Sequence, residues 1–137
     1  MNRNDKRSAI CRLDFLPISQ ATVKNRPGSN LIQVNGSFNP VPISSGEFRE
    51  TEEQGAPVEQ ELQAVVTDTG SGRLAEIREL FAQDGLVLLT FTNGEQRIVG
   101  TDEFPVHVNA ELSGSPQTLT LSFRRDSAEP AKNYSSF

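Results

Sequence analysis

Apolar and polar residues alternate along much of the second half of the chain. In the segment 58–66 the apolar residues share one face and the polar residues share the other: Val58, Leu62, Ala64 and Val66 against Glu59, Glu61 and Gln63. A period of two predicts a half-buried strand.

The segment 106–123 repeats this alternation on both sides of a turn at Gly114-Ser115-Pro116. One face of both arms is apolar, with Val106, Val108, Ala110 and Leu112 in the first arm and Leu119, Leu121 and Phe123 in the second. We predict a hairpin with this face in the core, and with His107 and Arg124 on the face toward water.

Between these strands the apolar spacing changes to that of a helix. Leu74, Ile77, Leu80 and Phe81 recur every three or four residues, which predicts a helix from about 72 to 83 that ends at Asp84-Gly85. The following run 86–101 has Asn93-Gly94 between two strand-like segments, which favours a hairpin with a type I′ turn. That register would place Leu89 opposite Ile98 and Leu88 opposite Val99, in the middle of the fold.

The first half of the chain is less regular. Cys11, Leu13 and Phe15 alternate with Arg12 and Asp14, which predicts a strand with a buried thiol, and a second extended piece covers Leu31–Val34. Residues 35–57 are rich in Gly and Pro and predict a long loop, interrupted at most by a short strand near Phe48.

These elements predict a mainly β fold, an antiparallel β-sandwich or partly closed barrel with one packed helix. The domain layout is a flexible basic arm over 1–9, a single β-rich domain over 10–125 with the loop at 35–57, and a flexible tail over 126–137.

The amino-acid composition argues against some classes of binding partner. The chain has 137 residues and a net charge of -5, so it lacks the excess of Lys and Arg that nucleic acid or an anionic membrane requires. Cys11 is the only cysteine, and no apolar run has the length of a signal peptide or a membrane span. We expect a protein of the bacterial cytoplasm, or of a virion that assembles there. The basic residues of 1–30 and the acidic residues of 47–61 could join neighbouring copies.

Two short motifs resemble parts of a known catalytic site. Val65–Ser71 resembles the Asp-Thr-Gly-Ser signature of aspartic proteases, and Ile98-Val99-Gly100 resembles a later element of that family, which implies a dimeric protease that uses Asp68-Thr69-Gly70-Ser71. The helix that follows at once favours a strand-to-helix turn instead, in which one of these side chains caps the first helical amides. His107 has no second His or Cys nearby, and the carboxylates of 47–61 lack calcium-loop spacing, so we expect no catalytic, metal or cofactor residues.

The stretch Val58–Arg125 is similar to the small virion proteins of tailed bacteriophages and prophages, especially tail-tube and head-tail connecting proteins. The likeness lies in the order of elements and in the run Leu-Thr-Phe-Thr-Asn-Gly-Glu-Gln-Arg-Ile-Val-Gly-Thr from Leu89 to Thr101. It implies a non-enzymatic structural protein that self-associates through loops and termini and binds other virion proteins, with no small-molecule substrate. The alternative is a small protein-binding adaptor module.

Overall fold

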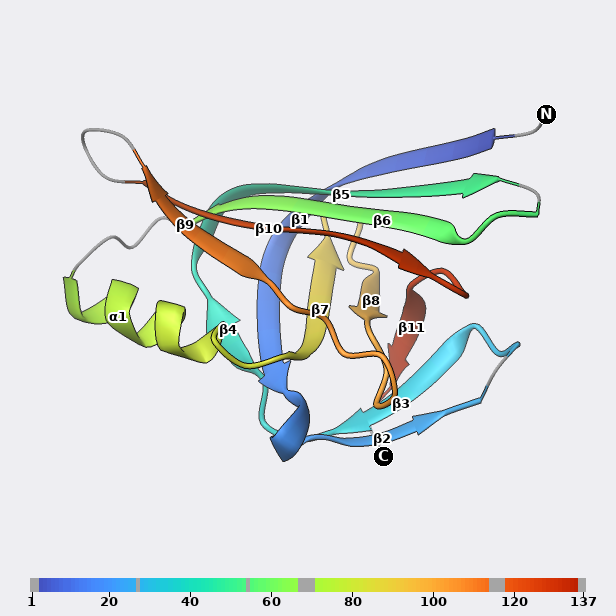
Figure 1. The fold of residues 1–137 in the computed structure, drawn as a ribbon, viewed down its shortest axis with the longest axis horizontal. Helices are drawn as coiled ribbons and strands as arrows, with labels where there is room; N and C mark the ends of the chain where they lie inside the picture. The colour runs from blue at the N-terminus through green and yellow to red at the C-terminus, as the bar shows by residue number, and fades with distance from the viewer. Residues whose placement is uncertain (1–2, 27, 54, 67–70, 114–117, 136–137) are drawn as a thin grey trace.

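The computed structural model describes residues 3–26, 28–53, 55–66, 71–113 and 118–135. These residues form a mainly β fold with one sheet of eleven strands and one α-helix, which confirms the predicted class. The sheet is strongly curved and does not close into a barrel (Figure 1). The elements, in chain order, are β1 (Arg3–Pro17), a 3-10 turn (Ile18–Gln20), β2 (Thr22–Asn25), β3 (Leu31–Asn35), β4 (Asn39–Val41), β5 (Ile43–Glu53), β6 (Val58–Val66), α1 (Ser71–Leu80), β7 (Gly85–Phe91), β8 (Gln96–Val99), β9 (Asn109–Ser113), β10 (Thr118–Ser127) and β11 (Lys132–Ser135).

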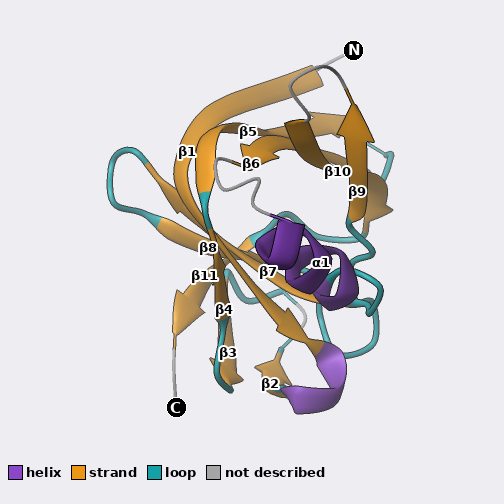
Figure 2. Ribbon diagram, turned by 90° about the vertical axis from the view of Figure 1, so that its left-hand side faces the viewer, coloured by secondary structure: helices purple, strands orange, loops and turns teal. Residues whose placement is uncertain are grey.

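The strand order is β2-β3-β11-β8-β7-β1-β5-β6-β10-β9, and β4 pairs with β1 outside this path. The long strand β1 belongs to both halves of the sheet, because Arg3–Ala9 pair with β5 and Ile10–Pro17 pair with β7. All pairs are antiparallel except that of β11 with β3. Figure 2 shows α1 in front of β7, below β9 and β10.

Two apolar clusters hold the sheet together. The larger cluster lies between the curved sheet and α1, where Phe81 packs against Phe15 with ring centroids 4.7 Å apart. The smaller cluster lies on the other face of β7, where Leu86 and Leu88 pack with residues of β3 such as Ile32. Since Leu86–Leu89 are all buried, β7 is covered on both faces, as the hairpin prediction required.

The helix and the last hairpin match their predictions where the structure describes them. Ile77 and Phe81 are buried, and the side chain of Leu74 lies outside the described part. Leu119 pairs with Leu112 and Leu121 pairs with Ala110, with the predicted apolar face inward. The turn at 114–116 lies outside the described residues.

The expected long loop over 35–57 is wrong, because it contains β4 and the eleven residues of β5. β5 carries many acidic residues and only Ile43 and Phe48 as large apolar residues, so the apolar pattern gave little sign of a strand. Its backbone pairs with β1 on one side and with β6 on the other, and this pairing defines it.

The expected arm and tail are also corrected. Residues 3–9 continue β1 beside β5, so the basic segment lies in register with the acidic segment 47–53 of the same chain. Residues 132–135 form β11 between β8 and β3, and the ring of Tyr134 packs edge-on against Phe38 at 5.6 Å. Phe137 lies outside the described residues.

Cys11 is exposed rather than buried, because the register of β1 against β7 shifts between Ile10 and Arg12. A bulge of this kind inserts one extra residue and changes the face on which it lies. Asp14, on the polar side of the predicted alternation, is buried, because it pairs with Leu88 and so lies on the face that the smaller cluster covers. Its carboxylate accepts two bonds from Arg12, at 2.9 and 3.2 Å, and this pairing raises the pKa of Arg12.

The β7–β8 hairpin has a different register from the predicted one. Leu88 pairs with Ile98 and Leu89 pairs with Arg97, one residue away from expectation. The Gly94 amide donates to the Phe91 carbonyl, and Gly94 alone takes a positive φ of 91°. This is a three-residue loop with a type I turn followed by a left-handed glycine, not a type I′ turn.

Candidate functional site

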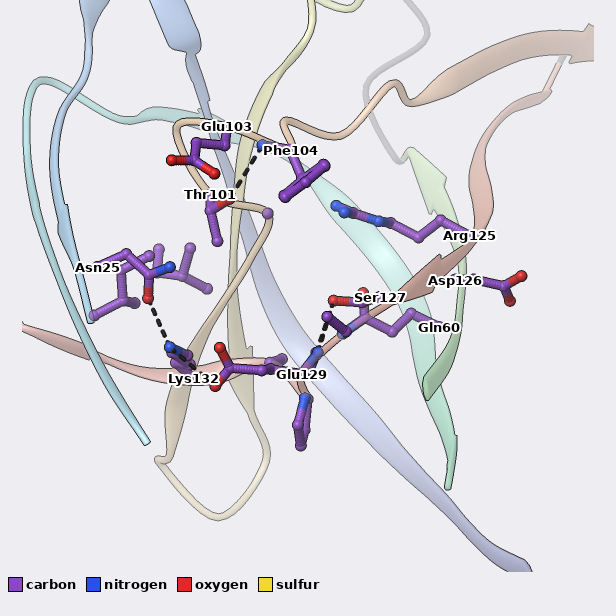
Figure 3. A pocket seen from close by; sticks show the side chains of 16 residues that line it. Asn25, Gln60, Thr101, Glu103, Phe104, Arg125, Asp126, Ser127, Glu129 and Lys132 are labelled. Atoms are coloured by element: carbon purple, nitrogen blue, oxygen red, sulfur yellow. Dashed lines mark hydrogen bonds and ion pairs between the residues drawn. The ribbon is translucent and has the colours of Figure 1, made fainter. Parts of the chain in front are cut away.

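A pocket of about 400 Å³ lies where the end of β10, the segment 128–131 and the loop 100–104 meet (Figure 3). Residues of β2, β3, β6 and β8 complete its walls. Its lining combines apolar residues with many polar and charged ones, and a pocket of this volume is large enough for a small ligand.

Strand alternation places two polar side chains on the inner face beside this pocket. Gln60 lies two residues after Val58 and two before Leu62, and both of these apolar residues are buried. Arg125 lies two residues after Phe123, which is also buried. Gln60 and Arg125 are also register partners across the β6–β10 pair. Their Cβ atoms are therefore expected to lie within about 5.5 Å of each other.

Gln60 is 2% exposed and takes part in a buried network. Its Nε2 donates to Oε2 of Glu50 at 2.9 Å, and the same oxygen accepts a bond from the Ala131 amide at 2.6 Å. The Oε1 atom of Gln60 is buried and has no donor in the described part of the chain. A buried acceptor without a partner is rare in proteins, because water no longer solvates it.

Arg125 also has a buried polar atom. Its Nη1 atom is buried without a hydrogen-bond acceptor among the described residues. Burial lowers the pKa of the guanidinium, which still carries its charge at neutral pH. In Figure 3 the guanidinium extends toward Phe104, across the pocket from Lys132.

Lys132 is the second cation of the pocket, and its ammonium group already has hydrogen-bond acceptors within the protein. The ammonium lies 2.6 Å from Asn25 Oδ1, 3.0 Å from the Arg26 carbonyl and 3.2 Å from Glu129 Oε2. An ammonium has three N–H groups, so these three acceptors satisfy it. Arg125 is thus the cation of this pocket with an open donor.

The remaining lining is mixed. Ile32 and Ile98 are buried apolar residues of the wall, whereas Phe104 is 64% exposed. Two hydrogen bonds hold the loop that carries Phe104: the Thr101 amide donates to the Phe104 carbonyl, and the Phe104 amide donates to the Thr101 hydroxyl oxygen, each at 3.1 Å. The carboxylates of Glu103 and Asp126 are on exposed residues.

The candidate residues named in the sequence analysis do not line this pocket. Asp68-Thr69-Gly70 lie outside the described residues, and Ser71 begins α1. His107 is exposed, with Nδ1 2.9 Å from Asp84 Oδ1. Within the described ranges no group of three or more His, Cys, Asp or Glu side chains is arranged to hold a metal ion. No helix in this part is long and apolar enough to cross a membrane.

Comparison of the chain with family models, with curated proteins and with solved structures finds no match.

Gln60 and Arg125 were not predicted as site residues. The signal was present in the alternation, which places a polar residue in the apolar series 58–66 and a cation two residues after Phe123. Arg125 stands next to Arg124, which is exposed. Because side chains alternate between the two faces of a strand, Arg124 points outward and Arg125 points inward.

Proposed function

We propose that the protein is a non-enzymatic structural protein that assembles with further copies of itself, as a tail or neck component of a phage or prophage virion. The observation that supports self-association best is a free strand edge along the first half of β1. The virion assignment rests on the resemblance of Val58–Arg125 described above, and it implies a location in the host cytoplasm or in the particle.

The free edge follows from the pairing of β1. Arg3–Ala9 pair with β5 along one edge, and β7 pairs with β1 only from Ile10 onward. Within the described residues, no strand pairs with the second edge of this half. Figure 1 shows it along the upper margin of the molecule, on the side away from β5.

The direction of the backbone groups can be derived from one hydrogen bond. The Ala9 carbonyl accepts a bond from the Thr92 amide, so the peptide groups of Ala9 point away from β5. Peptide groups alternate in direction along a strand, so those of Arg7 and Asp5 point the same way. They offer N–H and C=O groups to an incoming strand.

An unpaired edge is a template for strand addition, which provides affinity through main-chain hydrogen bonds. A ring requires two different surfaces on each copy. The sheet supplies further edges at β9 and β2, which stand at the two ends of the strand order. Pairing of the β1 edge with one of them would join copies head to tail.

Light scattering after gel filtration, from low micromolar to near-millimolar concentration, tests the proposal, and negative-stain microscopy would show rings or tubes. Asp5→Pro removes an N–H from the free edge and leaves the bonds to β5 in place. Asp5→Ala is the control, because it removes the same carboxylate and keeps the N–H.

We expect oligomers of the unaltered chain and of Asp5→Ala, and weaker association of Asp5→Pro. A chain that stays monomeric at every concentration would contradict self-association. Equal association of the two variants would contradict the β1 edge as the contact surface.

A further inference from the structure

We propose that the free edge of β1 in one copy pairs with the outer edge of β9 in the next copy, so that one sheet continues from subunit to subunit. The inference rests on the self-association proposed above and names its second surface. Two strands stand at the ends of the strand order, β2 and β9. The place of each strand in the sheet and its charge both favour β9.

The first half of β1 and β9 are the two edges of one block of strands. The order in this block is β1-β5-β6-β10-β9, and Figure 1 shows these strands in that order from the upper margin of the molecule downwards. β2 lies instead at the far end of the other half, beyond β7, β8, β11 and β3. A β1–β9 contact between copies therefore continues one block of strands into the next.

The outer edge of β9 is open in the part of the chain that the structure describes. There β9 pairs with β10 alone, and Asn109–Ser113 make no backbone hydrogen bond to a loop or turn. Peptide groups alternate in direction along a strand, so some of those of β9 point away from β10. They are available to an added strand.

The strand directions determine the kind of pairing. Each strand of the block is antiparallel to the next, so β1 and β9 run in the same sense. In a ring larger than a dimer, the rotation from one copy to the next does not reverse the direction of a strand. The contact between β1 and β9 is therefore parallel, and the same contact repeats at every interface.

Charge distinguishes β9 from β2 as the partner of β1. Residues 3–9 contain three basic residues and one acidic residue, and β2 carries a further cation, the exposed Lys24. β9 has no basic residue, and its one charged residue is Glu111, which is exposed. Opposite charges on neighbouring strands stabilise their pairing, and like charges destabilise it. The basic half of β1 thus fits β9 better than β2.

The same rule disfavours the pairing of an edge with its own copy. Two β1 edges would bring two basic segments together, and two β9 edges would bring two acidic strands together. Charge therefore favours two different edges at each contact. A closed ring requires this arrangement.

The acidic residues of β5 work against an incoming Glu111. β5 pairs with the other edge of β1 and carries four glutamates between residues 47 and 53. A strand added to β1 would lie one strand spacing, about 5 Å, from β1 and two spacings, about 10 Å, from β5. Salt screens exposed charges beyond about 8 Å, so the nearer charges of β1 have the larger effect.

The first test compares light scattering after gel filtration of three variants of the full chain. Glu111→Lys replaces an attraction by a repulsion, and we expect association about tenfold weaker. Glu111→Gln removes only the attraction and should weaken association about threefold. Lys24→Glu reverses the charge at an exposed position of β2, and it should associate like the unaltered chain.

Mixing two blocked chains shows which edges meet. Asp5→Pro blocks β1 and leaves β9 intact, whereas Glu111→Lys weakens β9 and leaves β1 intact. If β1 meets β9, the two variants form a one-to-one pair that does not grow further. A mixture in which Asp5→Pro enters no pair would overturn the inference, because this is the result expected if two β1 edges meet.

Hydrogen exchange of the unaltered chain gives a measurement that needs no variant. We expect slower amide exchange of 3–7 and 109–113 in the concentrated than in the dilute protein, and no change in 22–25. Assembly of Glu111→Lys equal to that of the unaltered chain, or protection of 22–25 in place of 109–113, would overturn the β9 contact and leave self-association standing. A chain that stays monomeric at every concentration would overturn both.

Discussion

The buried carboxylate of Glu50 provides the sharpest test of the packing described above. Glu50 is 5% exposed, and one oxygen accepts bonds from the Gln60 amide at 2.9 Å and from the Ala131 backbone at 2.6 Å. Glu50→Leu keeps the bulk and removes both acceptors. Two buried donors then lose their partners, at about 1–3 kcal/mol each. We expect the free energy of unfolding to fall by about 2–6 kcal/mol in total.

Urea unfolding followed by circular dichroism measures this loss. With an m-value of about 2 kcal/mol/M, the midpoint should fall by about 1–3 M. Glu50→Gln retains an acceptor oxygen and should lose less than half as much. Glu47→Leu, at an exposed position of the same strand, should change stability by no more than about 0.5 kcal/mol. An unchanged midpoint for Glu50→Leu, or an equal loss for Glu47→Leu, would refute the assigned network.

Three further predictions concern the core, a close approach and the thiol. Phe81→Asp places an unpaired charge in the larger cluster and should lower stability by more than about 4 kcal/mol in thermal melts, whereas Ala82→Asp, at an exposed position, should cost about 1 kcal/mol or less. Gly85→Ala should cost about 2–3 kcal/mol in urea unfolding, since a Cβ at this position would clash with the Leu16 carbonyl oxygen. Cys11 should react with a thiol reagent in the native protein as fast as in urea, and protection in the native state would contradict its exposure on the bulge.

Sequence predicted the elements whose stability comes from an apolar face. The strand Val58–Val66, the helix around Phe81 and the last hairpin each bury one face against the larger cluster, and the period of their apolar residues reflects that burial directly. The doubly buried β7 was also predicted as central, because it has a continuous apolar run.

Elements whose stability comes from pairing could not be predicted in this way. β5 lies between two strands and needs no apolar stripe of its own, and β11 pairs with β3 from the opposite end of the chain. The bulge at Cys11 depends on the register with β7, which local alternation does not contain. The inward direction of Gln60 and Arg125 in the pocket could have been predicted from strand alternation alone. The position of Phe104 could not, because its loop approaches these residues only in the folded sheet.

The parallel pairing of β3 with β11 sets an order for folding during synthesis. β3 pairs with β2 and with β11, and β11 is formed by Lys132–Ser135, close to the end of the chain. β3 must therefore wait for β11, which is made about 100 residues later. At about 5–20 residues per second, translation would leave the β2–β3 hairpin without its neighbour strand for several seconds. During that interval its edge is open to strands of other nascent chains on the same messenger, and a chaperone that covers β3 would raise the yield of folded protein.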